Sequence, residues 1–409
     1  MKIILVTQYF WPESFMINDV VRAMHAQGHE ITVVTGQPNY PDGATFKGYK
    51  AWHLNAEEFL RGVTLHRIPT YPRKKGGALN LILNYGVFVA SGLLFMPWIL
   101  RGLKVDAVLV YAPSPLTQAI PAIFVGRLKR APVALWVQDL WPESLESTGF
   151  VKNKTVLKLV GILVKSIYAG CNTLIAQSHA FMPAMARYGP KKPIVYHPNS
   201  FPDDNQGKAI DLPTKLDEVL SNYFCVVFAG NLGKFQSLET IVDVARRLNE
   251  QAEIRFVLIG SGERSVWLEQ QKETLKLENL VLPGRFPIEA MPGILRKCSA
   301  LMVTLNDDPT FNATVPGKVQ AYLSAGRPIL AGINGEGARV IRESGAGLIS
   351  QAQDAEGLLT NVMRMYSMTQ DERDTMGQLG RAYYLEHFEV QAQTRRLVKT
   401  LANMGENGL

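Results

Sequence analysis

The chain has 409 residues, of which 47% are hydrophobic and 19% are charged. This composition excludes an intrinsically disordered chain, and the length allows two domains with cores of ordinary size. The net charge of +7 favours an anionic partner, for which a nucleotide-sugar phosphate, an acidic membrane surface and a nucleic acid are the candidates. Three cysteines (Cys171, Cys225 and Cys298) lie in apolar runs without metal-ligand spacing, which indicates buried thiols and a reducing cytosol.

The first residues predict a buried strand and not a signal peptide. Residues 3–6 are apolar, but this run is too short for the hydrophobic region of a signal peptide. A helix around residues 20–24 and a second strand over residues 31–34 follow, and a strand–helix–strand unit of this length indicates a parallel sheet. No Gly-x-Gly-x-x-Gly follows the first strand, so we do not expect a dinucleotide-dependent dehydrogenase.

Residues 76–100 carry no charge and are long enough to cross a bilayer, which takes about 20 residues. A transmembrane span would split the first domain between its strands, which leaves two interpretations open: a helix buried in the domain, or a helix that dips into the membrane interface. Basic residues flank the run at both ends: Arg73, Lys74, Lys75, Arg101 and Lys104. Such flanks suit anionic lipid head groups. Residues 151–168, in which four lysines alternate with aliphatic residues, allow either a solvated face or docking on a membrane.

The tetrapeptide Trp-Pro-Glu-Ser occurs twice, at residues 11–14 and 141–144. Each copy follows a predicted buried strand, and because the carboxyl ends of parallel strands meet at one edge of a sheet, both copies are expected at the cleft edge. Chance or ancestral duplication would also explain the repeat. The functional interpretation is an acceptor pocket, since aromatic faces and carboxylates suit sugar hydroxyls. In it we expect Trp11, Glu13, Trp141 and Glu143 to bind the acceptor, and Asp139 and Glu13 to take part in catalysis.

A second domain is predicted after residues 201–220, which are rich in Pro, Asp and Lys and indicate an interdomain linker. A buried strand over residues 223–229 leads into a glycine-containing loop, residues 230–237, and then into a helix. Because glycine lets the backbone approach a ligand closely, this loop predicts a phosphate cradle, although a plain strand-to-helix turn would look the same.

A second phosphate-binding position is predicted near Lys318. Residues 300–305 predict a buried strand, and the loop over residues 306–315 leads from its end to a helix that begins near Pro316 and is capped by Gly326. This loop therefore lies outside the carboxyl end of a strand and at the start of a helix, where an anion is favoured. The Lys318 side chain would add a positive charge.

The order Pro-x-Lys, then Tyr-Leu-x-x-Gly-Arg-Pro, then an apolar strand resembles the donor-nucleotide region of retaining family 4 glycosyltransferases of the GT-B fold. The resemblance extends over nearly the whole chain and implies an α/β protein with two Rossmann-like domains that face each other across a cleft. Residues 1–200 would form the acceptor domain, 201–220 the linker, 221–380 the nucleotide-sugar-binding domain, and 381–409 a helix that returns to the N-terminal domain. Two glutamates that the family normally carries are replaced by Ala313 and Ala321, so their roles do not transfer.

The resemblance also implies the donor site. Lys234 and Lys318 would neutralise the leaving diphosphate, Lys234 as a catalytic residue, and Arg285 and Phe286 would line the base. The full donor-binding set is Gly230, Asn231, Gly233, Lys234, Gly260, Arg285, Phe286, Thr314, Pro316, Gly317 and Lys318. Because the resembled enzymes usually neutralise the diphosphate with Lys, Arg and a helix N-terminus, we expect no metal ion and no other cofactor.

These features predict a retaining glycosyltransferase of the hexosyl or N-acetylhexosaminyl type. It would move a sugar from a nucleotide diphosphate-sugar, expected to be a UDP-sugar, to a polyprenyl diphosphate-linked glycan in the synthesis of a bacterial O-antigen, capsule or exopolysaccharide. We expect it in the cytoplasm, peripherally associated with the inner face of the cell membrane, with no nucleic-acid partner. Two alternatives stay open: a GT-B nucleotide-sugar epimerase, and a non-catalytic membrane-associated partner of an active transferase, which the two alanines favour.

Overall fold

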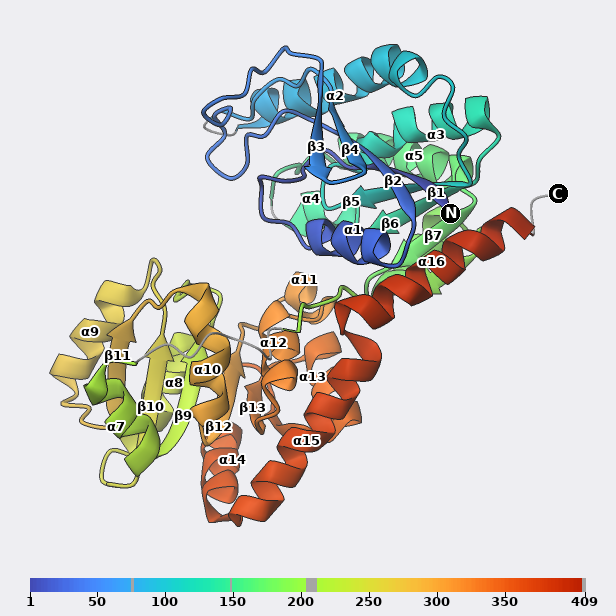
Figure 1. Cartoon of the computed structure of the whole chain (residues 1–409). Coiled ribbons are helices and arrows are strands. Elements are labelled where there is room, and N and C mark those ends of the chain that lie inside the picture. The colour runs from blue at the N-terminus through green and yellow to red at the C-terminus, as the bar shows by residue number, and fades with distance from the viewer. Residues whose placement is uncertain (75–76, 148, 204–211, 407–409) are drawn as a thin grey trace. The chain divides into compact units, whose positions relative to one another are not determined.

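The computed structural model describes residues 1–74, 77–147, 149–203 and 212–406 (Figure 1). The chain folds into two compact units. Unit 1 comprises Met1–Ser200 and Val390–Leu409, and unit 2 comprises Phe201–Glu389. Each unit is an α/β structure built on a mainly parallel sheet, as the sequence predicts. Lys75, one of the predicted basic flanking residues, lies outside the described residues.

Unit 1 contains an eight-stranded sheet in the order β3-β4-β2-β1-β5-β6-β7-β8, in which only the β3–β4 pair is antiparallel. Its strands are β1 (Lys2–Val6), β2 (Glu30–Thr35), β3 (Asn55–Leu60), β4 (Val63–Arg67), β5 (Ala107–Ala112), β6 (Val133–Val137), β7 (Thr173–Ala176) and β8 (Ile194–Tyr196). Its helices are α1 (Ile17–Ala26), α2 (Ala78–Ile99), η1 (Leu116–Gln118), α3 (Ala119–Lys129), α4 (Glu143–Ser147), α5 (Lys154–Gly170), α6 (Phe181–Tyr188) and α16 (Val390–Glu406). The central strands are continuous apolar runs because helices cover both faces of a parallel sheet.

The core of unit 1 joins segments from both ends of the chain. Val20 of α1 and Leu397 of α16 pack with Leu5 and Trp136 in one buried cluster. Helices α2, α3 and α5 form another layer, in which α3 contacts α2, α5 and the strands β5 and β6. Gly92 of α2 lies against Pro121 of α3, where an added Cβ would come within 2.7 Å of the proline Cβ. The sheet of unit 1 therefore lies between two helical layers.

Helix α2 exposes an apolar face, so the sequence-based interpretation of a buried helix is wrong. The most exposed side chains are Leu79 (71%), Leu94 (68%), Ile82 (62%) and Trp98 (56%). The buried side carries Phe88 and Met96 together with the polar Asn84, so the helix is apolar on both its buried and its exposed sides. Among the described residues, α2 is the helix whose length and composition would suffice to cross a membrane, and 28% of its most apolar window is buried.

Unit 2 contains a six-stranded parallel sheet in the order β11-β10-β9-β12-β13-β14. Its strands are β9 (Phe224–Ala229), β10 (Ile254–Ile259), β11 (Leu280–Gly284), β12 (Ala300–Thr304), β13 (Ile329–Gly332) and β14 (Gly347–Ser350). Its helices are α7 (Thr214–Asn222), α8 (Leu238–Arg247), α9 (Ser265–Thr274), η2 (Ile288–Ala290), α10 (Met291–Lys297), α11 (Pro309–Asn312), α12 (Gly317–Ala325), α13 (Gly335–Ser344), α14 (Ala355–Ser367) and α15 (Gln370–His387).

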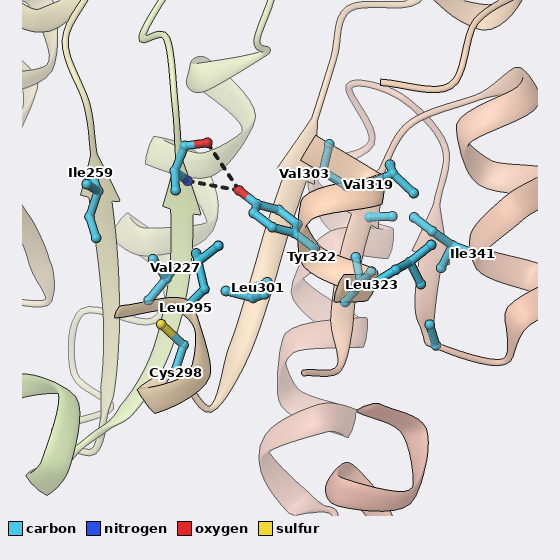
Figure 2. Packing of buried hydrophobic residues seen from close by; sticks show 14 of the residues in the cluster. Val227, Ile259, Leu295, Cys298, Leu301, Val303, Val319, Tyr322, Leu323 and Ile341 are labelled. Atoms are coloured by element: carbon cyan, nitrogen blue, oxygen red, sulfur yellow. Dashed lines mark hydrogen bonds between the residues drawn. The ribbon is translucent and has the colours of Figure 1, made fainter. Parts of the chain in front are cut away.

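Helix α12 is fastened to the sheet by Tyr322, which is buried among the side chains shown in Figure 2. The Tyr322 hydroxyl accepts a hydrogen bond from the Ala229 backbone N–H at 2.9 Å and donates one to the Ala229 carbonyl at 3.3 Å. This contact joins α12 to the end of β9, where the glycine loop begins. Gly326 ends the helix in the left-handed conformation with φ +66°, as predicted, whereas Pro316 caps α12 and stands outside its first turn.

The unit boundaries differ in detail from the predicted domain boundaries. Residues 214–220, predicted as linker, belong to α7, because Leu216 and Leu220 are buried in the core of unit 2. Residues 204–211 lie outside the described residues. The predicted returning helix over 381–409 is divided, since α15 belongs to unit 2 and α16 to unit 1, with the boundary after Glu389.

Candidate functional site

A cavity of about 770 Å³ lies in unit 2 at the carboxyl ends of β9 and β10 and beside α12. Seven predicted donor-binding residues line it: Gly230, Asn231, Gly260, Arg285, Phe286, Gly317 and Lys318. The other four, Gly233, Lys234, Thr314 and Pro316, are not among its lining residues. This is the size and position expected of a small-molecule site in an open α/β sheet.

Two glycines let neighbouring segments of the cavity wall pack closely against each other. Gly230 has φ +136° and Gly260 has φ +146°, a region that side-chain-bearing residues rarely adopt. A Cβ on Gly260 would lie 1.8 Å from the Gly230 carbonyl oxygen, and a Cβ on Gly230 would lie 2.8 Å from Cε of Lys318. The glycines are therefore required for the two loops and the lysine to meet at this wall.

Lys318 is a largely buried cation in this cavity. Its Nζ donates a hydrogen bond to Oε1 of Gln236 at 2.5 Å and lies 3.5 Å from the ring centroid of Phe228. Burial lowers the pKa of Lys318 to about 7, and no carboxylate of the described residues opposes that shift. A bound anion would restore the positive charge, so this lysine is suited to a phosphate.

Lys234 lies in a different environment from Lys318. It is exposed, and its Nζ is 4.9 Å from the Phe235 ring centroid. Its neighbour Gly233 is buried, and an added Cβ there would meet the side-chain amide of Asn231 at 2.6 Å. The structure therefore places one of the two predicted phosphate-binding lysines in the cavity and the other outside it.

The cavity also contains groups that sequence reasoning missed. Asp203 lines it and forms a two-pronged ion pair with Arg381 of α15, at 2.6 and 2.9 Å. Ala321 lines it too, at the position where the resembled family carries a glutamate. The Arg381 Nη1 group also donates to the Ser324 carbonyl at 3.0 Å, which fixes the ion pair to the end of α12. No local pattern could reveal this pair, because its members are far apart in sequence.

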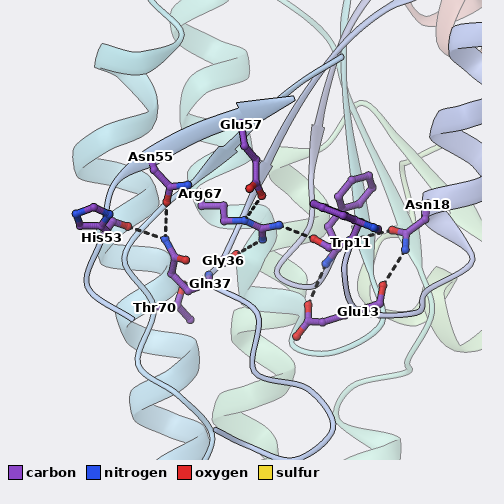
Figure 3. A network of polar contacts seen from close by, with 11 residues as sticks. Trp11, Glu13, Asn18, Gly36, Gln37, His53, Asn55, Glu57, Arg67 and Thr70 are labelled. Carbon is purple, nitrogen blue, oxygen red and sulfur yellow. Dashed lines mark hydrogen bonds and ion pairs between the residues drawn. The ribbon is translucent and has the colours of Figure 1, made fainter. Parts of the chain in front are cut away.

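Glu13 of unit 1 is buried and fully engaged by backbone groups. Its Oε1 accepts hydrogen bonds from the N–H groups of Asn39 (2.9 Å) and Tyr40 (2.7 Å), and its Oε2 accepts one from Phe10 (3.1 Å). Burial raises the pKa of Glu13, and these three N–H groups oppose the rise. The carboxylate thus holds two loops together. Figure 3 shows it beside Arg67, which donates to the carbonyls of Trp11 and Gly36.

The Asp139 side chain is partly exposed, whereas that of Glu13 is buried. Its Oδ2 accepts a hydrogen bond from the indole N–H of Trp141 at 3.2 Å. Burial raises the pKa of Asp139, while hydrogen bonds from Ser144, Trp141 and Ser114 oppose the rise. A half-buried carboxylate beside an aromatic ring, at the carboxyl end of β6, is suited to accept a hydrogen bond from a ligand hydroxyl.

Glu143, in the second Trp-Pro-Glu-Ser copy, has an exposed side-chain fraction of 35%, and its nearest cation is Arg187 at 3.7 Å. Trp141 is buried and its ring centroid lies 6.3 Å from that of Tyr85. The structure therefore brings Asp139 and Trp141 together and separates Glu13 from ligand chemistry. Within the described residues, no group of three or more His, Cys, Asp or Glu side chains could hold a metal ion.

Two family models match the chain and together span most of it. Residues 15–200 match the "Glycosyl transferase 4-like domain" and residues 224–368 match "Glycosyl transferases group 1". A putative colanic acid biosynthesis glycosyl transferase, WcaI of Escherichia coli strain K12, is 26% identical over 340 residues, which cover 80% of this chain and 82% of that protein.

Solved structures share the fold over the full length. HepE of Anabaena, in complex with UDP, aligns with a TM-score of 0.68 at 14% identity and covers 98% of this chain and 100% of its own. Sucrose-phosphate synthase of Thermosynechococcus elongatus aligns with a TM-score of 0.72 at 12% identity and covers 99% of both chains. With two matched domains and two Rossmann-like units, the chain belongs to the family 4 glycosyltransferases of the GT-B fold.

Proposed function

We propose that this glycosyltransferase uses a UDP-sugar and a lipid-linked glycan acceptor in the biosynthesis of a surface polysaccharide. The donor part of this proposal rests on the cavity of unit 2, in which the partly buried Lys318 has no carboxylate partner among the described residues. Similar proteins support the donor and the polysaccharide pathway: HepE is described in complex with UDP, and WcaI is named for colanic acid biosynthesis.

The chemistry follows from the groups present. Departure of a nucleoside diphosphate leaves negative charge, which Lys318 in a partly dry cavity would stabilise together with Arg285. Asp139 would accept a hydrogen bond from the attacking acceptor hydroxyl and take up its proton as the bond between the sugar and the diphosphate breaks and the new glycosidic bond forms. We propose retention of configuration by attack from the leaving-group side, a route that needs no protein nucleophile and that this site would run with its cations and without a metal ion.

We propose further that the enzyme works at the inner face of the cell membrane. Residues 59–202 contain 17 Lys and Arg but only four Asp and Glu, against 43 and 36 in the whole chain. The basic excess of the chain therefore comes from this stretch, which includes the outward apolar face of α2. Helix α5 adds exposed Leu159 and Ile162 between lysines. An apolar face with cations and few anions suits an anionic bilayer.

Vesicle flotation tests this localisation. Leu94→Glu should weaken binding to phosphatidylglycerol vesicles about tenfold, because it places a charge on the face that enters the lipid. Val266→Glu is the matched control, since Val266 of unit 2 is equally exposed at 70%. Equal binding of both variants and the wild type would contradict the proposed localisation.

Thermal unfolding with UDP, GDP, ADP and CMP tests the donor. A nucleotide at about 100 times its dissociation constant should stabilise the fold by about 2.7 kcal/mol. Because the free Lys318 has a pKa of about 7 and a phosphate favours its charged form, UDP affinity should fall as the pH rises above 7, by up to about tenfold per pH unit. Lys318→Met should bind UDP weakly and without this pH dependence.

The alternative of a non-catalytic partner is favoured by Ala313 and Ala321, which stand where the resembled family carries glutamates. If no nucleotide raises the unfolding temperature of the wild type, with or without EDTA, this alternative replaces the transferase proposal. A shift with GDP alone would change the donor and leave the rest of the proposal intact. Conversion of a free nucleotide sugar to its epimer, without an acceptor, would favour the epimerase.

A further inference from the structure

Arg73 is a half-buried cation at the carboxyl edge of the unit 1 sheet, in the segment that joins β4 to α2. Its guanidinium carbon lies 5.2 Å from the ring centroid of Tyr40 and 5.9 Å from that of Tyr9. Its charge also acts on Tyr85, whose pKa it lowers against the larger effect of burial. Among the described residues, no Asp or Glu forms an ion pair with Arg73.

Hydrogen bonds to buried polar groups hold the backbone around Arg73 in place. The backbone N–H of Arg73 donates to Oδ1 of Asn39 at 3.1 Å, and the backbone N–H of Lys74 donates to the carbonyl of Gly43 at 2.7 Å. Asn39 and Tyr40 in turn donate their N–H groups to the buried Glu13. Glu13 is therefore a positioning residue, which fixes the loop that holds both Arg73 and the Tyr40 ring.

The tyrosines are tied to α2 as well. Tyr9 donates from its hydroxyl to Oδ1 of Asn84 at 3.3 Å, and Gln8 donates to the same oxygen at 2.6 Å. Asn84 lies on the buried side of α2, whose outward side in the same turns carries the exposed Ile82 and Leu83. Arg73 and its aromatic neighbours thus lie near the N-terminal end of α2, which has an exposed apolar face.

We propose that Arg73, which lies over the rings of Tyr9 and Tyr40 and near Tyr85, binds the phosphate groups of the lipid-linked acceptor, an inference that rests on the proposed function. Aromatic faces attract a guanidinium but do not neutralise it, and a planar guanidinium binds phosphate oxygens in pairs. If the phosphate groups of a lipid bind here, its apolar chain would lie along the exposed face of α2. Ser114 interacts with both Tyr85 and Asp139, so the sugar next to the phosphate would lie toward the Asp139 carboxylate.

Farnesyl diphosphate, a short and soluble lipid diphosphate, is the probe, with isothermal titration calorimetry as the measurement. Arg73→Gln should weaken its binding about tenfold, and Arg73→Lys should weaken it less, because lysine keeps the charge and loses the paired geometry. Arg101→Gln is the matched control. Arg101 also lies over an aromatic ring, 5.5 Å from the centroid of Trp98, but at the other end of α2. It should retain wild-type affinity.

Three outcomes would overturn the inference. The first is an equal loss in Arg73→Gln and Arg101→Gln, which would indicate general attraction to a basic surface. The second is equally tight binding of inorganic pyrophosphate, which would indicate a site for free phosphate. The third is a wild type that binds UDP but not farnesyl diphosphate, a result that leaves the donor part of the proposed function standing. A wild type that binds neither would reject both. Unfolding curves of each variant without ligand check that the variants fold.

Discussion

The two Trp-Pro-Glu-Ser copies are the same in sequence and different in what surrounds them. The match extends to the preceding glutamine, since Gln8 and Gln138 stand at equivalent positions, and both Trp–Pro peptide bonds are cis. In the first copy, Glu13 is 3% exposed and accepts three backbone N–H groups. In the second, the Glu143 side chain is 35% exposed but both of its carboxylate oxygens are buried, and its nearest cation is Arg187 at 3.7 Å.

The difference comes from a neighbouring loop. Beside the first copy runs the loop after β2, whose Asn39 and Tyr40 point their N–H groups at Glu13. Near the second copy are instead the side chains of Tyr168 and Tyr188. The same four residues therefore hold a carboxylate bonded by three backbone N–H groups in one place and a carboxylate with a single distant cation in the other. Identical motifs at equivalent strand ends do not imply identical roles.

Removal of Glu13 should show the largest effect. Glu13→Ala leaves three buried N–H groups without acceptors and should lower the free energy of unfolding by about 3 kcal/mol, as measured by urea denaturation. Because burial raises the pKa of Glu13, protonation of this group stabilises the folded wild type relative to the unfolded chain. The loss in the free energy of unfolding caused by Glu13→Ala should therefore be larger at pH 5 than at pH 7. Glu143→Ala is the control and should change stability by less than about 0.5 kcal/mol. Similar losses in both variants would remove the contrast.

The next contrast lies at one of the two positions that differ between the copies, where Tyr9 stands in the first and Asp139 in the second. Asp139→Asn should lower kcat about 100-fold, because the amide cannot accept the acceptor's proton. It should not lower the free energy of unfolding at pH 7, since the raised pKa of Asp139 means that its charged form is held at a cost. Tyr9→Phe should leave kcat within about threefold of the wild type. A stable Asp139→Asn variant with full activity would exclude the catalytic role.

The pH profile sharpens the same contrast. Burial raises the pKa of Asp139, so its carboxylate becomes protonated at a higher pH than a free aspartate. The wild-type kcat/KM should therefore fall as the pH falls through that raised pKa, by about tenfold per pH unit below it. Asp139→Asn should lack this acid limb. If the limb persists in the variant, another group causes it.

The smallest expected effect is at Glu143. Glu143→Gln should raise the acceptor KM by no more than about threefold and leave kcat unchanged, because both carboxylate oxygens are buried and their nearest cation is Arg187 at 3.7 Å. Arg187→Gln tests whether the ion pair matters, and at 3.7 Å and 70% exposure of the arginine it should change neither constant. A change in kcat for Glu143→Gln would place this residue, and not Asp139, at the reaction.

Much of the fold was predictable because its signals are local. The strands of both sheets are buried on two faces, so they appear as short apolar runs such as β5 and β12, and glycine at 326 marks the end of α12. Seven of the eleven predicted donor residues line the cavity, because loops after parallel strands meet at one sheet edge. The Asp203–Arg381 ion pair was not predictable, since nothing in either local sequence points to the other.

The sequence by itself determined two α/β domains, the position of the cavity in unit 2 and an uncharged helix of bilayer length, because apolar periodicity, glycine and charge act over a few neighbouring residues. Only the tertiary structure decided that Glu13 is a buried clamp, that Lys318 and not Lys234 lines the cavity, and that α2 turns Asn84 inward and leucines outward. A helix that is apolar on every side has no pattern to orient it, and a carboxylate acquires its role from donors that arrive from distant loops.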